Sequence, residues 1–332
     1  MTGAEMNKNV VTIGGSRGAF AVLRSLVTAL PAKIDAAIFV VLHVGKHKSE
    51  LPSLLSRWGK LPASYPGHGD PWHHGHIYVA PPDHHMMITE DTIQLSRGAK
   101  ENFSRPAIDP LFRSAAVALG ARVLGVILSG DLDDGAAGLA FVRAFGGRTL
   151  IQNPHQSEAA SMPRSAMEAA GADATAGPEE LGEAILAMLS AGIEGERKPM
   201  REKDMQALRT EAATAESEIG AYEALDSIAS RATITCPDCG GAMWQLRDGH
   251  PLRFRCHTGH AFSGLALTTA EDKAAEQAMW TALRTQKEAL ALARIRATQA
   301  KADGNHDAYQ LEQSRIQQSE RLLKILHTAM ST

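Results

Sequence analysis

Short, uninterrupted apolar runs recur between residues 10 and 189 and alternate with Ala- and Leu-rich segments of helical periodicity. Strands buried on both faces have this continuous apolar character, because neither face of the sheet meets water. The pattern predicts a doubly wound α/β fold, in which helices cover both faces of a mostly parallel sheet. The predicted strands are Val10–Gly14, Ala36–His43, Ile77–Ala80, Val123–Ser129 and Thr149–Gln152, and the predicted helices are Ala19–Ala29, Pro110–Leu119, Gly135–Phe145 and Glu179–Leu189.

The stretch Ile77–Leu95 departs from this pattern. Turn sequences at Pro81–Asp83 and Glu90–Asp91 divide it into short segments of strand character. We therefore expect an antiparallel edge beside the parallel strands.

The composition changes after Leu189. Residues 190–199 are small or charged and end in proline, as is usual for an exposed linker. Two long helical patterns follow Leu267 and are separated near Asp303–Asn305, which predicts a helical hairpin. The predicted organisation is an α/β domain over residues 1–195, a helical linker over 196–232, a metal-binding module over 233–265 and the hairpin over 266–332.

Composition excludes several classes of protein. The 332 residues carry a net charge of −3 and no long Lys/Arg run, so phosphate-backbone binding lacks electrostatic support and nucleic acid is not an expected partner. No stretch reaches the roughly 18 apolar residues of a membrane helix, and we expect no membrane insertion. The only three cysteines cluster in one short region, which fits reduced thiols in a cytoplasmic protein.

One serine stands where a strand becomes a helix, in the turn Gly14–Gly18. A glycine-rich turn lets backbone approach a ligand, and the following helix offers unpaired N–H groups to negative charge. Ser16 is therefore a candidate nucleophile beside an oxyanion hole. The same turn is also compatible with phosphate binding or with tight packing alone.

A serine hydroxyl needs a base, and the base needs a group that orients it. His43 closes the apolar run Ile38–Leu42, and Asp134 follows the predicted strand that begins at Val123. Ligands gather at the carboxyl ends of strands in open α/β sheets, and all three residues are predicted there. Alternatively, His43 is a structural histidine and Asp134 only caps the helix that follows it.

The order of the segments resembles the catalytic domain of the chemotaxis-type (CheB-type) protein-glutamate methylesterases, from about Val10 to about Leu189. The matching motifs are Ile13–Ser16, Leu42–Val44, Ile77–Met86, Ser104–Phe112, Leu128–Gly138, Gln152–Asn153, Glu158–Ala159 and Met162–Ala166. By this resemblance Ser16 is the nucleophile, His43 the general base and Asp134, rather than Asp131 or Asp133, the residue that orients the base.

The resemblance implies a serine hydrolase that removes methyl esters from glutamate side chains of a chemoreceptor or related signalling protein. Some family members also deamidate glutamine. Backbone N–H groups around Arg17 and in the loop Gly130–Leu132 are the expected oxyanion donors. The first catalytic strand begins within ten residues of Met1, so no phosphorylatable receiver domain is expected before it, and a receiver or kinase partner would act in trans.

Two residues depart from the family pattern. Arg17 replaces the small residue that usually follows the nucleophile, and Asp131 stands where methionine is common. We place both at the oxyanion loop or substrate rim, where an inward carboxylate would oppose developing negative charge. They motivate an alternative function, a non-catalytic partner-binding signalling protein that retains the fold. A nucleotide-binding domain ranks last, because a full Gly-x-Gly-x-x-Gly is missing.

A Cys-x-x-Cys turn and a Cys-x-x-x-His segment form the second constellation. Together they offer three sulfurs and one imidazole, enough for tetrahedral Zn²⁺. We predict that these residues hold a structural zinc ion and that the module around it contacts another protein; three unbound thiols are the alternative. Catalysis is expected to need no cofactor. The histidines between residues 68 and 85 are expected on surface loops. The predicted ligands are Cys236, Cys239, Cys256 and His260.

Overall fold

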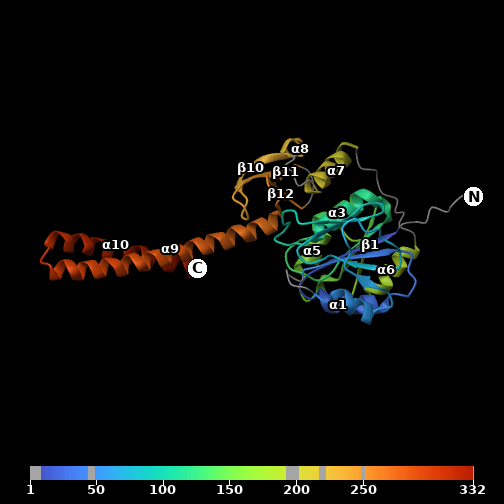
Figure 1. The fold of residues 1–332 in the computed structure, drawn as a ribbon, viewed down its shortest axis with the longest axis horizontal. Coiled ribbons are helices and arrows are strands. Elements are labelled where there is room, and N and C mark those ends of the chain that lie inside the picture. Colours follow the sequence, from blue (N-terminus) through green and yellow to red (C-terminus); the bar gives the residue numbers. More distant parts are fainter. Residues whose placement is uncertain (1–8, 44–48, 192–201, 217–221, 248–250, 332) are drawn as a thin grey trace, which may run out of the picture. The chain divides into compact units, whose positions relative to one another are not determined.

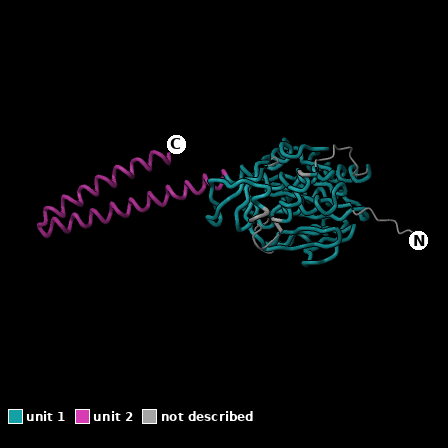
Figure 2. Tube along the Cα trace, turned by 90° about the horizontal axis from the view of Figure 1, so that it is seen from above, with its two compact units in different colours: residues 1–267 teal, residues 268–332 magenta. Residues whose placement is uncertain are grey.

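The computed structural model describes residues 9–43, 49–191, 202–216, 222–247 and 251–331. It divides into two compact units, Met1–Leu267 and Thr268–Thr332, which are coloured separately in Figure 2. The larger unit contains the sheet, its helices and the cysteine-containing segment.

A seven-stranded sheet forms the centre of the larger unit, and all of its pairings are parallel. Every residue of its three central strands is buried, which is why these strands read as unbroken apolar runs. This confirms the predicted α/β fold. In spatial order the strands are β3 (Ala63–Ser64), β4 (Ile77–Val79), β2 (Ala37–Leu42), β1 (Val10–Gly15), β7 (Val123–Ile127), β8 (Arg148–Gln152) and β9 (Ala174–Ala176).

Alternate residues of each strand face opposite helical layers. Val11 and Ile13 of β1 belong to one hydrophobic cluster, whereas Val10 belongs to the other. Figure 1 shows helices α1 and α3 on opposite sides of the sheet. The first layer contains α1 (Ala19–Ala29), α2 (Leu51–Trp58) and α6 (Leu181–Ser190); the second contains α3 (Ile108–Leu119), α4 (Ala136–Ala144) and α5 (Ser161–Ala170). Two 3₁₀ turns, Gly120–Arg122 and Pro154–Gln156, complete the connections.

The predicted antiparallel pair forms a two-stranded sheet of its own, β5 (His85–Ile88) with β6 (Ile93–Ser96). It packs against α3, where the Ile88 N–H donates to Ser114 Oγ at 3.1 Å. His85 was expected on a surface loop, and that expectation is wrong, because its side chain is buried in β5. Its Nε2 donates to the Ala99 carbonyl and its Nδ1 accepts from the Ala107 N–H, and burial lowers its pKa.

The linker predicted after Leu189 and the boundary near residue 195 fall almost entirely outside the described residues. Helices α7 (Glu202–Glu216) and α8 (Tyr222–Ile228) lie within the predicted helical linker. Beyond them, residues 229–247 and 251–263 contain a four-stranded antiparallel sheet, and we call this part of the chain the cysteine module. Its strands are β10 (Ala229–Thr235), β11 (Ala242–Leu246), β12 (Arg253–Cys256) and β13 (Ala261–Ser263).

Helices α9 (Gly264–Ala302) and α10 (His306–Met330) confirm the predicted hairpin. Gly304 takes a left-handed φ of 66° at the turn, and the Asn305 side chain accepts from the Ala308 N–H to begin α10. Within the described part of the chain, none of the helices combines the length and the apolar character that crossing a membrane requires.

Candidate active site

Ser16 lies directly after β1, in a turn that glycine makes possible. Gly18 begins α1 with a left-handed φ of 79°, and a Cβ at this position would lie 2.6 Å from Glu158 Cβ. The Ser16 N–H donates to the Ser129 carbonyl at 2.9 Å, and Ser129 Oγ donates to the Arg17 carbonyl at 2.8 Å. Ser129, which the sequence did not single out, thus fixes the nucleophile turn from the end of a neighbouring strand.

His43 is brought beside Ser16 by strand register. Gly15 pairs with Leu42 in the parallel ladder of β1 and β2, and the His43 N–H donates to the Gly15 carbonyl at 3.2 Å. Because neighbouring strands lie about 4.8 Å apart, the residues that follow this pair are adjacent. The structure therefore places the predicted nucleophile next to the predicted base.

Asp134 completes the arrangement from the loop after β7, the strand on the other side of β1. Its Oδ2 lies 2.9 Å from His43 Nε2, and the Asp134 side chain is 3% exposed against 18% for His43. The order of the strands changes direction between β1 and β7, and such a switch point is where open α/β sheets place their ligand sites.

The Asp134 carboxylate is held by the start of α3. It accepts from the Ile108 N–H at 2.7 Å, from the Asp109 N–H at 3.3 Å and from Asn102 Nδ2 at 3.2 Å. These N–H groups are unpaired donors of the helix N-terminus, which favours negative charge. Asp134 thus caps α3 while it binds His43; the helix that follows it, α4, begins at Gly135 without a side-chain cap.

This geometry fixes the roles of the two imidazole nitrogens. With Nε2–H donating to Asp134, the Nδ1 lone pair is left to accept the proton of the serine hydroxyl. Among the described residues, His43 Nδ1 and Ser16 Oγ have no hydrogen-bond partner, so both atoms are available for this transfer. The arrangement can activate a serine for nucleophilic attack.

The loop between β7 and α4 packs against Ser16. A Cβ at Gly130 would lie 3.1 Å from Ser16 Cβ, and Leu132 takes a left-handed φ of 59° while its carbonyl accepts from Ser161 Oγ. The Gly130 N–H already donates to the Ala159 carbonyl, which corrects its expected role as an oxyanion donor. The N–H groups of Arg17 and Asp131 remain predicted donors.

The two departures from the family pattern contact each other. Arg17 Nε donates to Asp131 Oδ2 at 2.7 Å and Arg17 Nη2 donates to Asp131 Oδ1 at 2.6 Å, with both side chains more than half exposed. The hydrogen bond to Arg17 lowers the pKa of Asp131, and the same bond raises the pKa of Arg17. The carboxylate at the oxyanion loop is therefore engaged by a cation.

The four predicted metal ligands also lie together. The ligand atoms of Cys236, Cys239, Cys256 and His260 are all within 4.8 Å of one another and could hold a metal ion. Cys239 Sγ and Cys256 Sγ are 3.8 Å apart, which is the edge of a tetrahedron with metal–sulfur bonds of about 2.3 Å. Gly259, with a φ of 99°, returns the chain so that His260 rather than His257 joins the cluster.

Fold and site together define a serine hydrolase built on an open α/β sheet. Residues 11–185 match the family described as CheB methylesterase, and the chain belongs to this family. A relative from Leptospira interrogans named "Putative protein-glutamate methylesterase/protein-glutamine glutaminase" is 33% identical over 191 residues, 57% of this chain and 99% of that protein.

Two further comparisons agree. Protein-glutamate methylesterase/protein-glutamine glutaminase 2 of Anaeromyxobacter dehalogenans is 34% identical over 177 residues, 53% of this chain and 52% of that protein. The crystal structure of the Thermotoga maritima CheB methylesterase catalytic domain has 26% sequence identity and a TM-score of 0.52, and the match covers 55% of this chain and 98% of that one. The matches span about half of this chain, as expected if the α/β domain alone is shared.

Proposed function

We propose that this protein hydrolyses methyl esters of glutamate side chains in a chemoreceptor or related signalling protein. The observation that carries the proposal is the 2.9 Å hydrogen bond between His43 Nε2 and the buried Asp134, beside Ser16 at the switch point of the sheet. Membership in the CheB methylesterase family and the names of the relatives support the choice of ester.

Ser16 Oγ attacks the ester carbonyl while His43 Nδ1 takes its proton. Asp134 keeps the imidazole in the tautomer that this transfer needs and stabilises the imidazolium that forms. His43 then returns the proton to the departing methoxide, which leaves as methanol, and a water activated by the same nitrogen hydrolyses the acyl-enzyme. Glutamine deamidation would use the same steps with ammonia as the leaving group.

The ion pair of Arg17 and Asp131 belongs to the rim of this site. With its carboxylate paired, Asp131 opposes the developing oxyanion less than a free carboxylate would. The presence of Arg17 and Asp131 is therefore compatible with hydrolase activity.

For the cysteine module we propose a structural zinc ion held by Cys236, Cys239, Cys256 and His260. Three thiolates and an imidazole fill a tetrahedral shell and leave no coordination position for substrate water, so the ion would stabilise the fold of the module. Cysteines used in this way belong in a reducing compartment, which supports a cytoplasmic location. A receiver or kinase partner would act in trans.

The proposal is tested by methanol release from methylated receptors of the host. Ser16→Ala should abolish release, while Ser25→Ala on α1, which removes an exposed hydroxyl contacting Glu179, should leave it unchanged. Circular dichroism spectra of the two variants should coincide. Unchanged release by the Ser16 variant would show that another group carries the reaction.

A further inference from the structure

The cysteine module is joined to the α/β domain through the backbone of its last strand. The Asn102 N–H donates to the Ala261 carbonyl at 2.9 Å, and the Ala261 N–H donates to the Lys100 carbonyl at 3.2 Å. Residues 100–102 therefore pair with the edge strand β13 and extend the sheet of the module. Phe103 and Phe262 pack edge to face beside this pairing, with ring centroids 5.4 Å apart.

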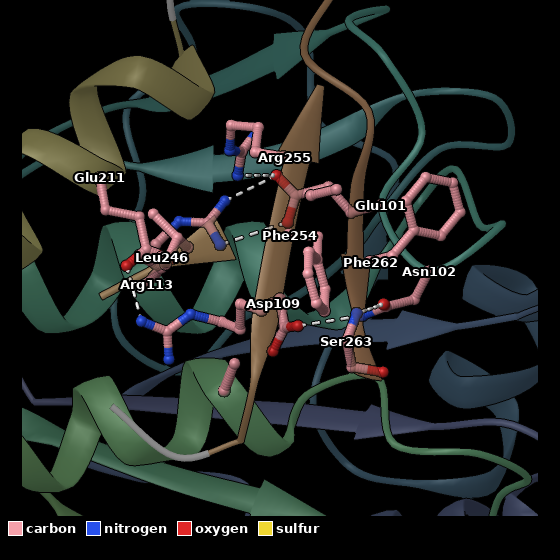
Figure 3. Close-up of a pocket in the computed structure, with 13 residues that line it drawn as sticks. Glu101, Asn102, Asp109, Arg113, Glu211, Leu246, Phe254, Arg255, Phe262 and Ser263 are labelled. Carbon is pink, nitrogen blue, oxygen red and sulfur yellow. Dashed lines mark hydrogen bonds and ion pairs between the residues drawn. The ribbon is translucent and has the colours of Figure 1, made fainter. Parts of the chain in front are cut away.

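A buried cluster of charges lies at the same junction. Glu101 accepts from Arg113 of α3 at 2.8 Å and from Arg255 of β12 at 3.0 Å, and all three side chains are buried (Figure 3). Burial alone would raise the pKa of Glu101, but the two guanidiniums hold it below its usual range. Separating these side chains would leave a buried charge without its partner, which is energetically costly. The cluster therefore stabilises the contact between the cysteine module and the α/β domain.

The Asn102 side chain bridges this junction to the active site. Its Nδ2 donates to Asp109 Oδ2 at 3.1 Å and to Asp134 Oδ1 at 3.2 Å, while its Oδ1 accepts from the Ser263 N–H at 2.9 Å. Because the Ser263 N–H needs an acceptor, Asn102 Oδ1 faces Ser263 and Asn102 Nδ2 faces the two carboxylates. Asn102 and Phe103 have left-handed φ values of 47° and 65°, a conformation that persists only where surrounding contacts hold it.

Ser263 makes a second contact with the catalytic loop. Its hydroxyl donates to Asp133 Oδ1 at 2.6 Å and accepts from the Ala266 N–H at 3.0 Å, so the residue that precedes α9 also holds the neighbour of the catalytic aspartate. Both Ser263 and Asp133 are buried.

We propose that Asn102 and Ser263 are positioning residues, through which the cysteine module holds the Asp134 carboxylate in line with His43. This inference rests on the proposed hydrolase function and adds that the α/β domain depends on the module for full activity. Both residues act through other groups, Asn102 through Asp134 and Ser263 through Asp133. The module supplies an N–H that orients the Asn102 amide and a hydroxyl that anchors the loop.

The test measures the rate at which a fluorophosphonate labels Ser16 of the full chain. Asn102→Gly suits the left-handed backbone and removes the amide; Ser263→Ala removes the hydroxyl. Both should lower the labelling rate about tenfold, since small misplacements of catalytic groups have effects of this size or larger.

Ser263→Thr, which keeps the hydroxyl, should recover most of the rate. Ser230→Ala is the matched control, because Ser230 lies on the same module but contacts Arg247. Labelling rates of both Asn102→Gly and Ser263→Ala within twofold of the parent would overturn the inference and leave the hydrolase function standing. If Ser263→Ala fails to fold, Asn102→Gly decides alone. A parent protein that is not labelled at all would overturn the proposed function and this inference with it.

Discussion

Arg17 and Asp131 form a two-point ion pair beside the nucleophile, with contacts of 2.7 and 2.6 Å between turns that are 114 residues apart in the sequence. Asp131 alone would place an anion near the developing oxyanion and oppose its charge, and Arg17 supplies the cation that neutralises this carboxylate. Together they are electrically neutral and geometrically matched, as a guanidinium and a carboxylate are.

This pairing predicts non-additive effects on activity. Arg17→Ala leaves the Asp131 carboxylate without its cation near the oxyanion and should lower kcat by about tenfold, a fraction of what the loss of one oxyanion donor causes. The double variant Arg17→Ala/Asp131→Ala removes both charges and should recover most of kcat. Steady-state ester hydrolysis by the parent, the two single variants and the double variant gives the double-mutant cycle. Equal losses of kcat in Arg17→Ala and in the double variant would contradict this prediction.

Asp134→Asn should reduce the rate of fluorophosphonate labelling of Ser16 by about 10³–10⁴-fold, because the imidazole loses its orienting anion and its preferred tautomer. This measurement needs no receptor. Asp70→Asn provides the control, since Asp70 is an exposed turn residue that accepts from the Gly67 N–H. Comparable rates for the two variants would show that Asp134 serves only to cap α3.

Glu101→Gln should lower the free energy of unfolding by about 3–5 kcal/mol, because it leaves the buried guanidiniums of Arg113 and Arg255 uncompensated. Glu90→Gln, at an exposed carboxylate 3.9 Å from Arg122, should change it by no more than about 0.5 kcal/mol. Denaturant titration of both variants measures the difference.

The same pair of proteins tests a pH dependence. The pKa of Glu101 is lowered in the folded state, so its contribution is present above the ordinary value of 4.5 and is lost as pH falls through the folded value. The stability difference between parent and Glu101→Gln should therefore shrink as the solution is acidified below about pH 4.5. A difference that grows under acid would refute the assignment.

Metal content distinguishes the two neighbouring histidines of the cysteine module. The purified chain should contain about one zinc ion, which His260→Gln should lose and His257→Gln should retain. The side-chain hydrogen bond to Cys256 raises the pKa of His260 to about 9, so the metal must displace a proton and its affinity should rise with pH up to that value. Elemental analysis and competition with a chelating dye give both quantities.

Patterns within single segments predicted much of this molecule. The apolar runs identified the parallel strands because burial on both faces leaves no polar positions, and the positions of Ser16, His43 and Asp134 at strand ends followed from the order of the segments. Cysteine spacing likewise predicted a cluster that the structure brings within 4.8 Å.

Contacts between distant segments were not predictable in this way. The pairing of Arg17 with Asp131 depends on which loops the sheet order makes adjacent, and the two residues appeared only as separate anomalies. Asn102 had no sequence signal beyond the tolerance of asparagine for left-handed backbone. The sheet of the cysteine module was missed for a similar reason, since its strands are short and their partners include backbone of the α/β domain.

The bond between Asn102 and Ser263 joins residues 161 positions apart, which has a consequence for biosynthesis. Translation delivers Ser16, His43 and Asp134 to the folding domain well before residue 263 leaves the ribosome. Closure of this contact is thus a late step in folding. The Asn102–Ser263 contact forms only after the cysteine module has been synthesised and has packed against the α/β domain. Full esterase activity is therefore delayed until that part of the chain has folded.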